Sequence, residues 1–147
     1  MNITTTRFGE IEVAPERVLN FPSGIPGFPD LRSVAIIAAA ETEQFASLEG
    51  VENLYYLQST DDADLAFLCM DPFAAFAEYE IEIDESEHDL VDPTEALVLS
   101  IMTVPQDPAS AVTVNLRAPI VANTRTRTAS QIVLDDSRWS VTQPLGA

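Results

Sequence analysis

The feature that most constrains the fold is a period-two alternation of apolar and polar residues, repeated in short runs along the chain. In the run GEIEV, Ile11 and Val13 alternate with Glu10 and Glu12, which is typical of a half-buried strand. Gly9 separates this run from ITTTRF and predicts a hairpin. Further strand-like runs follow at intervals of roughly 8–12 residues, with only short helical interruptions. This spacing predicts a compact all-β domain, either a sandwich or a barrel.

The other elements are predicted from local patterns. The pair Asp71 and Pro72 predicts a helical turn in DPFAAFAEY, with Asp71 as its N-cap. ESEHDLVD is a second short-helix candidate, DPTEA a further start signal, and ETEQFASLEG a loop or hairpin tip. The predicted strands are RVLNF, a run centred on residues 34–37, NLYYLQST, DLAFLCMD, EYEIEID, ALVLSIMTVP, two pieces of AVTVNLRAPIVAN that break at Pro119, and RTASQIVLDD.

The chain has 147 residues, which suits one domain that folds without a disulfide or metal. We predict a single domain over residues 1–147, with a core at about 3–139 and a C-terminal tail at 140–147. The one cysteine, Cys69, lies in the apolar run LAFLCM and is predicted to be a buried, inert thiol. The N-terminal residues lack the apolar core of a secretion signal, and no apolar run is long enough to span a membrane. We therefore expect a cytoplasmic protein.

The net charge of −17 narrows the possible partners. It arises from 24 acidic residues and 7 arginines, and the chain contains no lysine. Between Arg32 and Arg117 there is no lysine or arginine at all. Such a chain repels nucleic acids and anionic membranes, and attracts basic proteins. The same charge also fits simple solubility of a monomer, so charge alone leaves both interpretations open.

Catalytic chemistry finds little support in the residue types. His88 is the only histidine, and the acidic stretch DESEHDLVD around it carries no nucleophile signature. One cysteine and one histidine are too few for a structural zinc site. An EF-hand loop that began at Asp62 would need glycine and glutamate where Phe67 and Phe73 stand. We expect no cofactor and no catalytic residues.

One row of carboxylates keeps an enzymatic alternative open. Glu78, Glu80, Glu82 and Asp84 alternate along EYEIEID and share one face of the predicted strand. Such a row is typical of a solvated strand face, and it would also suit a carboxylate-based hydrolase or a cation-binding enzyme. That alternative requires a deep pocket lined by these acids. A third interpretation is an acidic mimic of nucleic acid that inhibits some other basic protein.

The octet FPSGIPGF raises the question of a phosphate-binding loop. Prolines lie within two residues of both Gly24 and Gly27, so amide donors are missing, and no lysine follows. We interpret the octet instead as a structural turn formed by Gly24, Pro26 and Gly27. Phe21 and Phe28 are predicted to anchor its two ends in the core.

Several motifs together resemble a known family. They are FGEIEV, FPSGIPGFPDL, LQSTDDADLAFLCMDPF, YEIEI, LVLSIMTVP and NLRAPIVANTRTRTASQIVLDDSRW. In this order and spacing, from about Ile3 to Trp139, the chain resembles the flagellar assembly factor FliW family. The resemblance implies a small, mainly antiparallel β-barrel-like fold and no catalysis.

The resemblance also implies partners. FliW proteins are cytoplasmic regulators that bind flagellin and antagonise the translational regulator CsrA, so that flagellin synthesis follows flagellar assembly. We expect the acidic middle of the chain to attract CsrA, and an apolar groove or an open strand edge to bind flagellin. The candidate contacts are Asp61, Asp62, Asp64, Tyr79, Glu80, Thr103, Val104, Pro105, Gln106 and Asp107.

Overall fold

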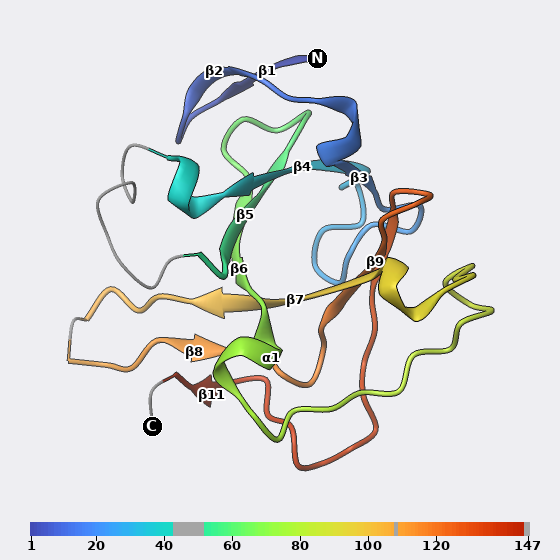
Figure 1. Cartoon of the computed structure of the whole chain (residues 1–147). Coiled ribbons are helices and arrows are strands. Elements are labelled where there is room, and N and C mark those ends of the chain that lie inside the picture. Colours follow the sequence, from blue (N-terminus) through green and yellow to red (C-terminus); the bar gives the residue numbers. More distant parts are fainter. Residues whose placement is uncertain (43–51, 108, 146–147) are drawn as a thin grey trace.

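The computed structural model describes residues 1–42, 52–107 and 109–145, and its main feature is a barrel-like sheet of seven strands (Figure 1). The order around the barrel is β3-β4-β5-β6-β7-β9-β10, and β10 returns to β3 through a parallel pair. The other ladders of the described residues are antiparallel. The strands are β3 (Val18–Asn20), β4 (Ser33–Ala38), β5 (Leu54–Ser59), β6 (Ala66–Met70), β7 (Ala96–Thr103), β9 (Ile120–Asn123) and β10 (Thr128–Gln131). The predicted all-β, barrel-like fold is confirmed.

β7 joins this barrel to a short extension of the sheet. Its first half pairs with β9, its centre with β6, and its last two residues with β8 (Thr113–Val114). β8 pairs in turn with β11 (Gln143–Pro144), so the C-terminal tail contributes a strand that the sequence analysis did not predict. The predicted break at Pro119 is confirmed, because β9 begins directly after it.

An N-terminal hairpin forms a separate two-stranded sheet. β1 (Asn2–Thr5) pairs with β2 (Gly9–Glu12), and Gly9 adopts a φ of 71°, as the predicted turn requires. The Val13 N–H extends the pairing by donating to the Met1 carbonyl at 2.7 Å. The side chains of Ile3 and Val13 are buried against β4, so the hairpin closes over one part of the barrel.

The main core lies among the barrel strands. Phe21, Leu57, Leu99 and other buried residues of β3 to β10 form one apolar cluster. Cys69 belongs to this cluster and is fully buried, and desolvation by burial raises the pKa of its thiol. The prediction of a buried thiol is therefore confirmed.

The octet at residues 21–28 is a tight turn, as predicted. Ile25 and Phe28 exchange two backbone hydrogen bonds around Pro26 and Gly27, and the φ of 86° at Gly27 is typical of a type II turn. Gly24 has a φ of 65°, and a Cβ atom there would lie 2.7 Å from the Pro29 carbonyl oxygen. Phe21 is buried as predicted.

The prediction for the other end of the octet was wrong. Phe28 is 40% exposed and packs edge-on against Phe67, with ring centroids 5.2 Å apart. Its backbone already closes the turn, so the side chain is not required as a core anchor.

Short helices connect several strands. They are η1 (Pro15–Arg17), η2 (Ala39–Glu41), α1 (Pro72–Ala75) and η3 (Pro93–Glu95). The predicted N-cap is confirmed, since the Asp71 carboxylate accepts a hydrogen bond from the Phe73 N–H at 3.0 Å. At η3, Asp92 and Glu95 form a capping box.

Two predicted elements are absent between these helices. Residues 79–84 form no strand and residues 85–89 form turns, so the strand EYEIEID and the helix ESEHDLVD were both wrong. Burial does alternate as predicted, with Tyr79 buried, Ile81 and Ile83 half-buried, and the acids exposed. No strand of the described residues pairs with this segment, and Asp84 caps a turn by accepting hydrogen bonds from the N–H groups of Ser86 and Glu87. The predicted loop ETEQFASLEG lies, apart from its first two residues, outside the described residues.

Candidate partner-binding groove

A groove of about 800 Å³ lies between the unpaired extended segment and the chain that follows β10. In Figure 1 the segment after α1 runs along the lower right of the view in yellow-green, near the orange-red chain after β10. The residues that line the groove are Glu80, Ile81, Glu82, Glu87, His88, Ser130, Gln131, Ile132, Val133, Leu134, Asp135, Asp136, Arg138 and Trp139.

Tyr79 fixes the start of the extended segment. Its hydroxyl donates to the Leu116 carbonyl at 2.7 Å, and its ring packs edge-on against Trp139 at 4.9 Å. Desolvation by burial raises the pKa of Tyr79 to about 12. In the free protein Tyr79 is thus an anchor with 4% of its surface exposed. Its predicted role as a partner contact stays a prediction.

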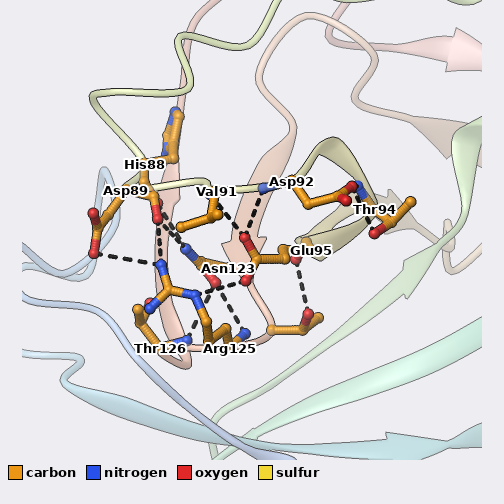
Figure 2. Close-up of polar contacts among 10 residues, drawn as sticks. His88, Asp89, Val91, Asp92, Thr94, Glu95, Asn123, Arg125 and Thr126 are labelled. Carbon is orange, nitrogen blue, oxygen red and sulfur yellow. Dashed lines mark hydrogen bonds and ion pairs between the residues drawn. The ribbon is translucent and has the colours of Figure 1, made fainter.

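Asn123 fixes the other end of the segment, as Figure 2 shows. Its Nδ2 donates to the carbonyls of His88 and Asp89, both at 3.0 Å. Its Oδ1 accepts from the N–H groups of Arg125 and Thr126 at 2.9 and 3.2 Å. Asn123 is 1% exposed, so one buried amide ties the loop to the turn between β9 and β10.

An ion pair completes this attachment (Figure 2). Arg125 Nε donates to Glu95 Oε2 at 2.6 Å, and Arg125 also donates to the Asp89 carbonyl at 2.7 Å. Glu95 Oε1 accepts from the N–H groups of Asp92 and Val91 at 2.9 and 2.8 Å. These two backbone hydrogen bonds, and to a smaller extent the hydrogen bond and charge of Arg125, hold the pKa of Glu95 below its usual range.

The groove carries an excess of negative charge. Five carboxylates line it, against one arginine, Arg138. Arg138 lies 2.7 Å from Asp136 and 3.5 Å from Glu80, and Asp136 is the main cause of its raised pKa. Glu82, Glu87 and Asp135 are left without a basic partner among the described residues, so the groove would attract cations.

The acids here lie on an open rim. The Glu80 side chain is 78% exposed, and Glu82 and Glu87 are exposed too. The hydrolase alternative needed a deep pocket that raises the pKa of one carboxyl group by burial. The groove exists, but its carboxylates meet solvent. In the described part of the chain, no group of three or more His, Cys, Asp or Glu residues is arranged to hold a metal ion.

Most of the other predicted contacts lie elsewhere. Asp61, Asp62 and Asp64 belong to the turn between β5 and β6, which contacts the N-terminal hairpin through the Thr6 N–H and the Ala63 carbonyl at 2.9 Å. In Figure 1 this turn is at the top of the view.

The last predicted group lies at the end of β7, at the left of the view in Figure 1. Thr103 pairs with Thr113 of β8, and Val104 is 60% exposed. Pro105, Gln106 and Asp107 continue the chain from there, with Pro105 half-buried and the other two exposed. Of the ten predicted contacts, only Glu80 lines the groove.

Sequence reasoning missed Asn123, Arg125 and the stretch after β10. For Asn123 and Arg125 the nearest local signal is the start signal DPTEA, which forms the capping box of Asp92 and Glu95 and indicates a helix start only. The described part of the chain contains no helix that is both long and apolar enough to cross a membrane.

Comparisons with known proteins agree with this architecture. The family model described as "FliW protein" matches residues 2–145. The flagellar assembly factor FliW of Bacillus subtilis (strain 168) is 33% identical, over 99% of this chain and 97% of its own length. That of Desulfitobacterium hafniense (strain Y51) is 37% identical, over 99% of this chain and 91% of its own length.

A solved structure gives the same result for the fold. The crystal structure of the flagellar assembly factor FliW superposes with a TM-score of 0.83 at 27% identity, and covers 100% of this chain and 98% of that one. Sequence and fold thus agree over the full length. The chain belongs to the FliW family of flagellar assembly factors.

Proposed function

We propose that this flagellar assembly factor is a cytoplasmic, non-enzymatic binding protein that antagonises CsrA and binds flagellin. CsrA and flagellin would compete for this protein, and that competition would couple flagellin synthesis to flagellar assembly. The protein binds no nucleic acid directly and is monomeric when free. The resemblance of the sequence to FliW proteins suggests CsrA and flagellin as the specific partners. The acidic groove supplies a physical reason for binding CsrA.

The acidic groove is the observation that supports CsrA as a partner. A protein that holds RNA needs basic surface, and a groove with five carboxylates and one arginine attracts such a surface. The net charge of −17 adds long-range steering and disfavours a phosphate backbone nearby.

The exposure of the groove acids favours binding over catalysis. A carboxyl group that acts as a general acid is commonly enclosed by apolar surroundings, whereas the Glu80 side chain is 78% exposed and lies beside Arg138. Exposed carboxylates of this kind suit a surface that attracts cations.

Titration calorimetry tests the proposal. The full chain is titrated with purified CsrA and with flagellin, at low and at high salt, and with hen lysozyme as an unrelated basic protein. We expect a stoichiometric CsrA complex that weakens with salt, a flagellin complex that competes with it, and no comparable lysozyme complex. No heat with either CsrA or flagellin would reject the proposal. Equal affinity for lysozyme would support a general acidic mimic instead.

A further inference from the structure

The extended segment on one side of the groove has unused backbone hydrogen-bonding groups. In the described part of the chain, no N–H or carbonyl group of residues 80–83 forms a hydrogen bond. The segment is nevertheless held in place, by Tyr79 before it and by the Asn123 contacts after it. An extended, fixed and unpaired backbone is the structure of a free strand edge.

The opposite side of the groove also presents a free edge. Ile132 N–H donates to the Pro119 carbonyl at 3.0 Å, and Leu134 N–H donates to the Arg117 carbonyl at 2.8 Å. Backbone groups of successive residues in an extended chain point to opposite sides, so those of Val133 point away from these partners. Val133 is 68% exposed and lines the groove.

The side chains between these edges define what would fit. Ile81 and Trp139 give the groove an apolar part, and the carboxylates of Glu82, Glu87 and Asp135 lie around it without basic partners among the described residues. A strand whose residues alternate between apolar and cationic would satisfy both. A second copy of this chain is a poor occupant, because two copies of net charge −17 repel each other.

We propose that the groove binds an extended, lysine- or arginine-rich segment of a partner protein as an added β-strand. The partner strand pairs with the backbone of residues 80–83 on one side and of Val133 on the other. This inference deepens the proposed function, since it assigns the place and the manner in which a basic partner binds.

The first test uses a synthetic peptide of about ten residues that alternates lysine with valine and threonine. Amide hydrogen exchange of the full chain is followed by NMR with and without this peptide. We expect exchange at Val133 and at alternate amides of residues 80–83 to slow by about tenfold or more when the peptide binds. Binding that leaves these amides unchanged, or no binding, would overturn the inference.

The second test separates pairing from charge. The same peptide, N-methylated at alternate residues, keeps every lysine but loses half of its backbone donors. We expect it to bind about tenfold more weakly. On the protein side, Val133→Pro removes one amide donor from the free edge, and Val133→Ala is the matched control that keeps it. Equal affinities for the two peptides would contradict strand addition. This comparison uses the unmodified protein, so it does not depend on whether Val133→Pro folds.

CsrA then distinguishes this inference from the proposed function. If amide exchange slows at the same residues in a CsrA complex, the result supports both the inference and the proposed function. A CsrA complex that protects other residues would overturn the inference and leave the function standing. Peptide binding without a CsrA complex would reject the function and leave the inference standing.

Discussion

Two four-residue runs, EIEV at 10–13 and EIEI at 80–83, have nearly the same sequence and different structures. The first contains most of β2, pairs with β1 and covers part of the core. The second has the same alternation of burial but no strand partner in the part of the chain that the structure describes. Alternation therefore determines which side chains are buried, whereas pairing depends on a partner strand being within reach. Gly9 provides that partner for the first run, because it turns the chain directly back along β1.

The largest effect is expected where the second run is held in place. Asn123→Ala removes the amide that bonds two carbonyls and two N–H groups, and those groups are then left in a buried site. We expect the free energy of unfolding, measured by urea titration, to fall by about 3 kcal/mol. Asn20→Ala, whose amide makes one exposed bond to the Arg127 carbonyl, is the control and should change stability far less. A small effect at Asn123 would show that other contacts hold the loop.

A smaller effect is expected at the turn that supplies the first run with its partner. Gly9 has a φ of 71° and open space where a Cβ would be placed, so Gly9→Ala suffers backbone strain without a clash. We expect a loss of about 1 kcal/mol, together with faster amide exchange in β2. Unchanged exchange in β2 would mean that the hairpin does not depend on this turn.

Acid should loosen the second run before the first. The folded state holds the pKa of Glu95 below its ordinary value, so the stabilisation is present above the unfolded-state pKa and is lost as pH falls through the lower folded-state pKa. We expect amides of residues 88–92 to exchange progressively faster, relative to those of β2, as pH is lowered from about 6 to about 3. Glu95→Gln should remove most of this difference, and a variant with an unchanged pH profile would contradict the role of Glu95.

The smallest effect concerns charge, and the two runs provide their own control. Replacing Glu80 and Glu82 by glutamine should slow association with CsrA at low salt by about threefold, through weaker steering. The same double change at Glu10 and Glu12 removes equal charge from the hairpin and should alter the rate less. Equal slowing in both variants would indicate that total charge matters and the groove does not.

Local signals in the sequence predicted much of the fold. The Gly9 hairpin, the cap at Asp71 and the start of β9 after Pro119 each depend on residues close together in the chain. The strand pairing that closes the barrel could not be predicted from local signals, because β7 pairs with three strands of the described residues and their pairing depends on distant segments. For the same reason the run at 80–83 was predicted as a strand.

The candidate site was predictable only in its charge. The acidic row near Glu80 was recognised, whereas the contacts that position it were not. Asn123 bonds to the carbonyl of a residue 35 positions earlier, and no local pattern indicates such a pairing. The stretch after β10 was predicted as part of a final strand. That its edge at Val133 is unpaired and lines the groove depends on the three-dimensional arrangement of distant segments, so the sequence does not indicate it.

The most direct test compares the amides of Val13 and Ile83 by hydrogen exchange, in the free protein and with the lysine-rich peptide bound. In the free protein the Val13 amide donates to Met1, whereas the Ile83 amide has no partner among the described residues. We expect Val13 to exchange slowly in both states. Residues 80–83 should exchange fast when free and, at alternate positions, slowly when bound. Slow amide exchange of residues 80–83 in the free protein, or unchanged exchange when the peptide is bound, would contradict a free strand edge that pairs with a partner strand.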